Sequence, residues 1–266
     1  MRLFQVDAFT SQRFGGNPAA ICLVDPGAGE VDAAWMQQVA AEMNLSETAF
    51  VARRPDGYGL RWFTPTVEVD LCGHATLAAA HALWAEAGES ADELRFHTRS
   101  GWLSARRAVL AEGRPGIELD FPSWPVEPAP LVPGLAEVLG TSIQWLGRAG
   151  DSHLVELADP AAVRAVAPDF AALRRLPVEG VLVTAAGGED SDFVSRYFHP
   201  NAGIDEDPVT GSAHCALAPY WAERFGRDQL VGRQLSARGG LVRVRLAGDR
   251  VVLGGEAVTV LRGELV

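Results

Sequence analysis

The pattern of hydrophobic and polar residues changes its period several times along the first half of the chain. Alternating apolar and polar residues at the N-terminus, in the stretch MRLFQVDAFT, are typical of a β-strand with one buried face. Apolar residues at helical spacing between 33 and 43 instead indicate a helix, and an alanine-rich helix follows Gly73. The pattern predicts strands at 3–9, 20–24, 47–53, 58–64, 101–110 and 116–121, and helices at 33–43 and from Gly73 to a C-cap at Gly88.

A proline-rich stretch separates the two halves of the chain. Residues 121–134, FPSWPVEPAPLVPG, are poor in periodicity, which is typical of a linker. A chain of 266 residues is long enough for one large domain or two of ordinary size. We therefore predict an N-terminal domain over residues 1–122 and a C-terminal domain over residues 123–266, and leave open whether the last strand packs on the first domain.

The second half of the sequence repeats the first. The stretch RWFTPTVEVDLCGHATLAAAHALWAEAG at 61–88 aligns with RYFHPNAGIDEDPVTGSAHCALAPYWAERFG at 196–226, with small insertions. So many matches in order indicate two related domains, and ligand pockets tend to lie where domains meet. The matched pairs are Arg61 and Arg196, Phe63 and Phe198, Pro65 and Pro200, Asp70 and Asp207, Gly73 and Gly211, and Ala75 and Ala213.

Each repeat carries a turn that enters a helix through small residues, Gly73-His74-Ala75 and Gly211-Ser212-Ala213. The first amides of a helix have no partner within the helix, and the helix dipole makes that end positive. Small residues leave the backbone uncovered, so a carboxylate or phosphate can approach it closely. A single glycine would merely start a helix. Because the turn is repeated, we favour a site for one small anion, bound by both turns.

The composition narrows the class of protein. Hydrophobic residues make up 48% and charged residues 21% of the chain, the balance of a soluble globular protein. The net charge of −11 and the lack of a Lys/Arg-rich run argue against binding to nucleic acid or to an anionic membrane. No apolar stretch is long enough to span a bilayer, and the N-terminus does not resemble a signal peptide. Three scattered cysteines indicate a reducing cytoplasm.

Several familiar kinds of site are disfavoured by spacing. Cys72 and His74 make a poor catalytic pair, because residues this close on a turn or helix start rarely face each other. Neither Cys72-x-His74 nor His214-Cys215 has the ligand spacing of a zinc protein. The sequence TGSAH is not a nucleophile elbow, which makes Ser212 a poor hydrolase nucleophile. No motif for a nicotinamide, flavin or pyridoxal phosphate is visible, so we predict neither a cofactor nor a metal.

Four motifs in combination resemble a known family. VDAFTSQRFGGNPAAICL, MNLSETAFV, RWFTP with DLCGHATLAAAHAL, and GIDEDPVTGSAH are together similar to the PhzF-like isomerases of phenazine biosynthesis, which have the diaminopimelate epimerase fold. The resemblance covers nearly the whole chain, and its motifs are specific only in combination. It implies an α+β fold of two pseudo-symmetric domains, each a mostly antiparallel, barrel-like sheet wrapped round a central helix. It also implies a site in the cleft between the domains and a homodimer.

In this family the proton carrier is a glutamate in an Asn-Leu-Ser-Glu stretch, which is Glu47 here. A carboxylate among apolar neighbours such as Leu45, Ala49 and Phe50 can have its pKa raised toward neutrality. It can then accept a proton from one carbon and return it to another. The alternative is that Glu47 ends a helix or opens a strand on a solvated face.

In the epimerase branch of this fold, two cysteines act as acid and base. Here Cys72 has Thr210 as its symmetry mate, and threonine cannot serve as a thiolate base. A two-thiol racemase is therefore disfavoured, and Cys72 is predicted to be a small buried residue.

The resemblance also places His74 and Asp207 beside Glu47. His74 would bind the substrate or tune Glu47, and Asp207 would orient His74 or accept a hydrogen bond from the substrate. A turn or helix cap is an almost equally good interpretation of Asp207. A shift of the alignment to Asp205 or Glu206 is also open.

The remaining candidates concern substrate binding. The amides of Gly73 and Gly211, with Ser212, would hold the substrate carboxylate. Asn17 would border the pocket or simply satisfy a turn. Arg61 and Arg196 fit structural ion pairs at least as well as an anion clamp.

Together these features predict a cytoplasmic, homodimeric, cofactor-independent isomerase. It would move a proton between carbons of a small, cyclic, carboxylate-bearing substrate bound in the interdomain cleft, with Glu47 as general acid and base. The alternatives are a racemase or epimerase of the same fold and a non-catalytic protein that binds a small ligand.

Overall fold

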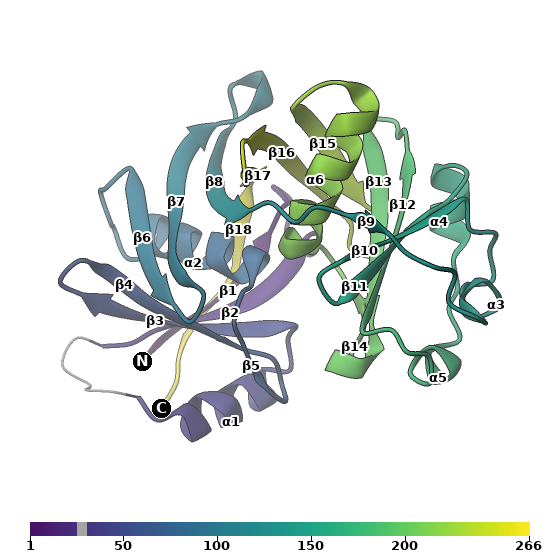
Figure 1. Ribbon diagram of the computed structural model, residues 1–266. Coiled ribbons are helices and arrows are strands. Elements are labelled where there is room, and N and C mark those ends of the chain that lie inside the picture. The colour runs from purple at the N-terminus through teal and green to yellow at the C-terminus, as the bar shows by residue number, and fades with distance from the viewer. Residues whose placement is uncertain (26–30) are drawn as a thin grey trace. The chain divides into compact units, whose positions relative to one another are not determined.

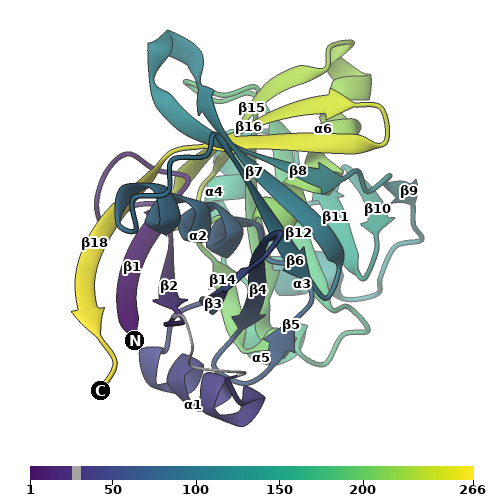
Figure 2. The same ribbon diagram turned by 90° about the vertical axis from the view of Figure 1, so that its left-hand side faces the viewer.

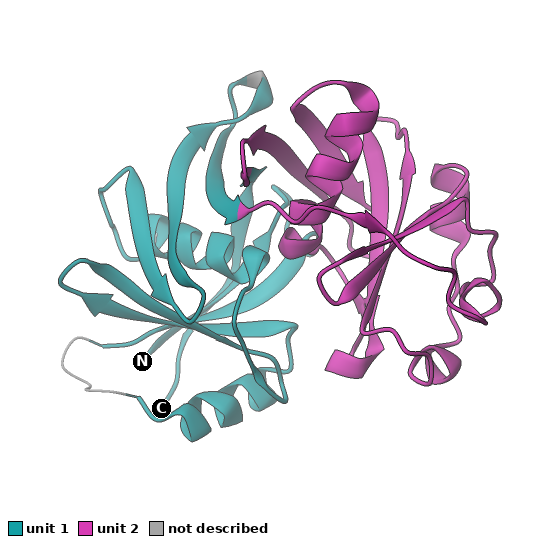
Figure 3. Cartoon of the chain, in the orientation of Figure 1, with its two compact units in different colours: residues 1–121, 252–266 teal, residues 122–251 magenta. Residues whose placement is uncertain are grey.

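The computed structural model describes residues 1–25 and 31–266, which form two compact units (Figures 1 and 3). Unit 1 comprises residues 1–121 and 252–266, and unit 2 comprises residues 122–251. The C-terminal residues belong to unit 1 because β18 (Ala257–Glu264) pairs with β1 (Arg2–Ala8) in an antiparallel manner. The sequence leaves open whether the last strand packs on the first domain, and the structure shows that it does.

The sheet of unit 1 is mostly antiparallel and curves around the helix α2 (Gly73–Ala85), as Figures 1 and 2 show. This helix is apolar on almost every side, and all its residues are buried except His81, Trp84 and Ala85. Such a helix must be covered on all sides, which explains why the strands wrap it. The other elements of unit 1 are β2 (Asn17–Leu23), α1 (Ala33–Met43), β3 (Glu47–Arg54), β4 (Gly57–Phe63), β5 (Glu68–Val69), β6 (Glu93–Thr98), β7 (Gly101–Val109), the 3₁₀ turn Ala111–Gly113 and β8 (Pro115–Pro122), whose last residue belongs to unit 2.

The helix α1 covers the opposite face of the same strands. Met36 and Ala40 of α1 pack with Ala20, Phe50 and Phe63 of the sheet. The strands β2 and β3 are thus covered on both faces, which explains why all residues of β2 and residues 48–51 of β3 are buried in succession. The bounds of α1 agree with the helix predicted from the spacing of apolar residues.

Two predicted boundaries in unit 1 are wrong. β2 begins at Asn17 rather than at residue 20, because pairing with β1 extends the strand through Pro18. α2 ends at Ala85 rather than at Gly88, and the amides of Glu86 and Ala87 both bond to the carbonyl of Ala82. At β2 the pairing with β1 outweighed the local signal of proline. At α2 the helix ends through hydrogen bonds of its own last turn, and Gly88 follows in the left-handed conformation (φ 74°).

Unit 2 is built in the same way around the helix α6 (Gly211–Phe225) (Figure 1). Its short helices pack on the outer face of the sheet, where Leu135, Val163 and Leu173 contribute to one core with residues of the strands. The other elements of unit 2 are β9 (Glu127–Pro128), α3 (Leu135–Leu139), β10 (Trp145–Ala149), β11 (Ser152–Glu156), α4 (Pro160–Ala165), α5 (Phe170–Leu173), β12 (Gly180–Ala186), β13 (Phe193–His199), the 3₁₀ turn Pro200–Ala202, β14 (Ile204–Asp207), β15 (Gln229–Gln234), β16 (Gly240–Ala247) and β17 (Arg250–Gly255), whose last residues belong to unit 1.

The strand pairings of unit 2 follow those of unit 1 in the same order. The antiparallel pair β1–β2, the parallel pair β2–β3 and the antiparallel pair β3–β4 correspond to β10–β11, β11–β12 and β12–β13. The parallel pair β4–β6, which is connected through α2, corresponds to β13–β15, which is connected through α6. Parallel neighbours need such a crossover, which is usually a helix. The predicted fold of two pseudo-symmetric α+β domains is confirmed.

The proline-rich stretch 121–134 is ordered on unit 2. Pro219 lies inside α6 and has no N–H, so it leaves the carbonyl of Cys215, four residues earlier, without its helical donor. The amide of Trp124 donates to this carbonyl at 3.0 Å. The same stretch contains β9, which pairs with β10.

Among the residues that the structure describes, every helix is too short or too polar to span a membrane.

Candidate active site

The Asn-Leu-Ser-Glu motif has a clear structural cause in unit 1. Asn44 ends α1 in the left-handed conformation (φ 50°, ψ 40°), which asparagine tolerates better than most residues. The chain then reverses and opens β3 at Glu47, opposite Ala19 of the parallel strand β2. Glu47 therefore opens a strand, as one interpretation predicted, but its side chain is only 14% exposed and does not lie on a solvated face.

The Gly-Gly-Asn-Pro motif brings Asn17 to the same end of the sheet. Gly16 has a φ of +61°, and a Cβ atom there would lie 2.1 Å from the carbonyl oxygen of Ala8. Only glycine fits this close approach of two chain segments. Asn17 then opens β2 opposite Ala8, and its side chain is fully buried.

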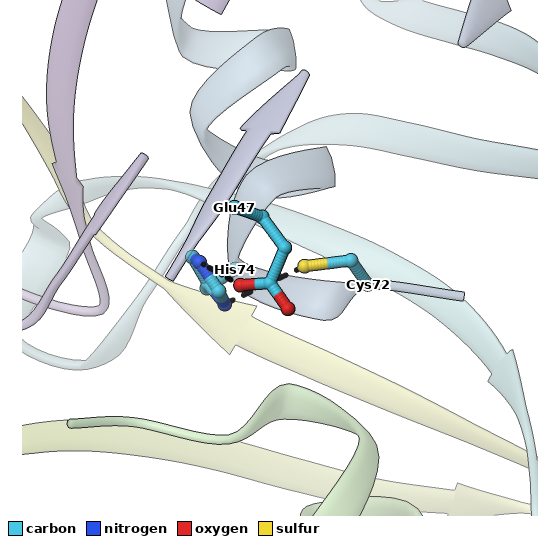
Figure 4. A group of neighbouring side chains, drawn as sticks. All are labelled: Glu47, Cys72 and His74. Carbon is cyan, nitrogen blue, oxygen red and sulfur yellow. Dashed lines mark hydrogen bonds and ion pairs between the residues drawn. The ribbon is translucent and has the colours of Figure 1, made fainter. Parts of the chain in front are cut away.

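Cys72 and His74 converge at the start of α2, contrary to the prediction that they would not face each other. The Cys72 sulfur lies 3.5 Å from Nδ1 of His74. The spacing rule for helices does not apply here, because Cys72 precedes the helix in an extended conformation (φ −144°, ψ 114°). Cys72 is buried, as predicted. Figure 4 shows the side chains of Cys72, His74 and Glu47 directed toward one another.

His74 is the centre of this group. Its Nδ1 lies 3.1 Å from the side-chain amide nitrogen of Asn17. Its Nε2 lies 3.2 Å from Oε2 of Glu47 (Figure 4). Burial lowers the pKa of His74 to about 3, so the ring is neutral near neutral pH. An amide nitrogen can only donate, so Nδ1 accepts and the ring proton is on Nε2, beside Glu47. The Glu47 contact is therefore one with a neutral imidazole, not an ion pair, and its alignment falls short of a hydrogen bond.

In unit 2 the carboxylate of Asp207 is fixed by a buried network. The Thr210 hydroxyl donates to Oδ2 of Asp207 at 2.5 Å. Gln234, which is fully buried, donates to this hydroxyl oxygen at 3.1 Å and to the carbonyl of Asp207 at 2.7 Å. The side-chain oxygen of Gln234 accepts from the Thr210 amide at 2.8 Å. Because Gln234 donates to the Thr210 oxygen, the hydroxyl proton is directed to Asp207.

The neighbours of Asp207 have different partners. Asp205 is half exposed and pairs with Arg174 at 2.5 Å. Glu206 pairs with Arg196 through two hydrogen bonds of 2.7 and 2.9 Å. Of the three adjacent acidic side chains, Asp207 alone is buried.

The two matched arginines form structural ion pairs. Arg61 binds Glu68 through hydrogen bonds of 2.7 and 2.8 Å, in the same two-pronged way as Arg196 binds Glu206. The repeat thus extends to side-chain geometry.

The two helix starts share a backbone but not a set of side chains. Thr210 precedes α6 in an extended conformation (φ −104°, ψ 99°), as Cys72 precedes α2. Neither helix is capped by a side chain or carries an acidic residue in its first turn. Gly73 and Gly211 are the first helical residues, and Ser212 follows in unit 2. Both ends keep the features that favour an anion.

Sequence reasoning missed Gln234, which is 24 residues from Thr210. A glutamine inside a strand carries no local signal of its partners, so only the fold could reveal it. In unit 1 the structure brings Asn17, Glu47 and His74 together and adds Cys72. In unit 2 it joins Asp207 to the start of α6 through Thr210.

Comparisons with known proteins agree with this architecture. The family model described as phenazine biosynthesis-like protein matches residues 6–263. An uncharacterized isomerase of Halalkalibacterium halodurans is 46% identical over 266 residues, which cover 99% of this chain and 97% of the relative. The human phenazine biosynthesis-like domain-containing protein is 39% identical over 290 residues. The match covers 99% of this chain and 98% of the human protein.

Solved structures lead to the same family. The crystal structure of a PhzF family protein from Enterococcus faecalis has a TM-score of 0.92 and 41% identity, and covers 100% of this chain and 98% of its own. A probable proline racemase from Agrobacterium radiobacter has a TM-score of 0.68 at 13% identity over 100% of this chain and 92% of its own, and shares the fold alone. The names of the curated relatives indicate an isomerase-type activity. Fold, motifs and relatives together show that the chain belongs to the phenazine biosynthesis-like, or PhzF, family.

Proposed function

We propose that the protein is a cofactor-independent isomerase that moves a proton between two carbons of a small, cyclic, carboxylate-bearing substrate. The observation that carries the proposal is the contact between the largely buried carboxylate of Glu47 and the buried, neutral imidazole of His74. A carboxylate in such surroundings is suited to accept a proton from carbon and to return it elsewhere.

In this mechanism His74 is a positioning group and a hydrogen-bond donor. Because Asn17 donates to Nδ1, the proton on Nε2 lies on the side of Glu47. A small rotation of the Glu47 carboxylate would complete a hydrogen bond to Nε2. That bond would hold the carboxylate while it takes a proton from the substrate, and would weaken when Glu47 is protonated. We assign to Asn17 the role of fixing the ring.

The substrate carboxylate would be bound at uncapped helix starts. The amides of Gly73 at the start of α2 and of Gly211 and Ser212 at the start of α6 are suited to an anion by their dipoles. Asp207, fixed by Thr210, would accept a hydrogen bond from a hydroxyl or amine of the substrate. That one substrate contacts both helix starts in a cleft stays a prediction, for which a co-crystal structure with a cyclic carboxylate is the test.

Deuterium exchange gives an assay that does not require the natural substrate to be known. A proton that moves through Glu47 can exchange with solvent, so the enzyme in deuterium oxide should label a carbon of any compound it turns over. We would screen cyclohexadiene and aromatic carboxylates by proton NMR. Glu47→Gln keeps the shape and removes the base, and should lower the exchange rate by about 10²–10⁴-fold.

The matched control is Glu68→Gln. Glu68 is 13% exposed, close to the 14% of Glu47, and lies in the same unit, but it pairs with Arg61. It should retain the exchange rate while losing some thermal stability. Exchange by Glu47→Gln at a rate near that of the wild type would refute the assignment.

A racemase of the two-thiol type has less support. At the position that matches Cys72, the Thr210 hydroxyl donates to Asp207, and a hydroxyl held as a donor cannot act as a base. Exchange at the α-carbon of free amino acids would favour a racemase, and ligand binding without exchange would favour a non-catalytic protein. The expected homodimer is checked by light scattering of the purified chain.

A further inference from the structure

The side chains at the start of α2 have the composition of a metal site. One ligand atom from each of Glu47, Cys72 and His74 lies within 4.8 Å of the other two. Figure 4 shows a carboxylate, a thiol and an imidazole converging from the start of β3 and the start of α2. Carboxylate, thiolate and imidazole are the protein ligands of zinc.

The distances fit such an ion after a small adjustment. Zinc bonds of about 2.0–2.3 Å in a tetrahedron place the ligand atoms roughly 3.3–3.7 Å apart. Oε2 of Glu47 is 3.2 Å from Nε2 of His74, and the Cys72 sulfur is 3.5 Å from Nδ1. One ring nitrogen alone can bind the ion, and the three ligand atoms lie within 4.8 Å of one another. The most distant ligand atom must therefore approach to the roughly 3.3–3.7 Å of a tetrahedral zinc site.

Asn17 supplies the outer partner that a metal-bound histidine requires. A histidine that binds zinc through one nitrogen usually donates its other N–H to an oxygen. The buried amide of Asn17 lies 3.1 Å from Nδ1 of His74. When Nε2 binds the ion, Nδ1 carries the proton, and a half-turn of the Asn17 amide presents its oxygen to it.

We propose that Glu47, Cys72 and His74 bind Zn²⁺ or a similar soft divalent ion, and that the bound ion inhibits the protein. Binding forms a bond from the metal to sulfur and releases the thiol proton to solvent, so no electrons are transferred. Three protein ligands leave a fourth position for water. The carboxylate of Glu47 would be bound to the ion and so could not carry out the proton transfer that the proposed function requires. The metal site itself does not depend on that function.

The test begins with metal binding to the full chain, without any activity assay. We would titrate metal-free protein with Zn²⁺ against a coloured chelator, and with Co²⁺ as a spectroscopic probe. We expect one ion per chain and a thiolate-to-cobalt absorption band in the near ultraviolet. Cys72→Ala should remove this band and weaken zinc binding by at least about tenfold, and Glu47→Gln should also weaken it.

The matched control is Cys22→Ala, a second buried cysteine of unit 1 that lies in the core beside Ala20 and Phe50. It should keep both the band and the zinc affinity. Absence of the band in the wild type, or equal zinc affinity of Cys72→Ala and the wild type, would overturn the site.

Inhibition is tested separately with any compound that shows deuterium exchange. Zinc should abolish exchange by the wild type, and a chelator should restore it. Cys72→Ala should resist zinc when its exchange rate with zinc is compared with its own rate without zinc. Zinc that binds the wild type without slowing exchange would overturn the inhibitory role. If the protein shows no exchange with any compound, the zinc and cobalt titrations still measure metal binding. Failure of the metal site and failure of the isomerase are therefore distinguishable.

Discussion

The starts of α2 and α6 have the same backbone conformation, but the carboxylate beside each has a different kind of partner. At α2 the carboxylate comes from another element, β3, and meets a neutral histidine. At α6 the carboxylate of Asp207 is three residues before Thr210 and accepts its hydroxyl, which Gln234 orients. A duplicated turn can thus serve two tasks. In the proposed function, the side chain that supplies the carboxylate, not the helix start, distinguishes the proton carrier Glu47 from the fixed acceptor Asp207.

The largest expected effect is the difference in deuterium-exchange rate between variants of the two carboxylates. Glu47→Gln should lower the deuterium-exchange rate by about 10²–10⁴-fold, whereas Asp207→Asn should lower it only about tenfold, because a fixed acceptor contributes less than a proton carrier. Steady-state kinetics on any compound that exchanges would measure both. Equal losses in the two variants would mean that Asp207 shares the proton transfer, and the contrast between the helix starts would fail.

The next effect concerns the pH dependence of stability in unit 2. His214 donates through Nδ1 to the carbonyl of Thr210 at 2.8 Å, and burial lowers its pKa from 6.5 to about 4. The unfolded chain therefore takes up the proton first as the pH falls. The stability from the neutral ring is complete above about pH 6.5 and decreases toward about pH 4, by about 3 kcal/mol in total.

Urea unfolding at several pH values would measure this decrease. His214→Asn can keep the hydrogen bond to Thr210 and cannot titrate, so its stability should depend less steeply on pH even if it is lower throughout. An unchanged slope would show that His214 does not titrate in this range.

The smallest effect compares the two matched ion pairs. The side chain of Arg196 is 13% exposed and also donates to the carbonyl of Val166 at 2.6 Å, whereas that of Arg61 is 32% exposed. Lysine cannot reproduce two-pronged binding in either place. We expect Arg196→Lys to lower the free energy of unfolding by about 2 kcal/mol, and Arg61→Lys by under about 1 kcal/mol. Equal losses would show that the additional carbonyl contact contributes nothing.

Much of the candidate site could be predicted from motifs, but its contacts could not. The resemblance placed Glu47 and His74 side by side, and they are 3.2 Å apart. It gave no reason to expect Asn17 against Nδ1 of His74, or Cys72 against the same nitrogen. These contacts depend on an extended residue before a helix and on two strands that start at one end of a sheet.

The sequence by itself determined the duplication and the character of the central helices. The matched residues at 61–88 and 196–226 are sufficient to predict two related domains. An alanine-rich helix without a polar face has to be buried on all sides. These features are local or repeated, so they can be recognised in the sequence alone.

The tertiary structure alone decided which distant groups meet. It paired β18 with β1 across the whole chain, and it gave the carbonyl freed by Pro219 to Trp124. It also joined Gln234 to Thr210. The physical reason is the same in each case. A hydrogen bond or a strand pairing between distant residues requires only that the fold bring complementary groups together, and this leaves no periodic trace in the sequence.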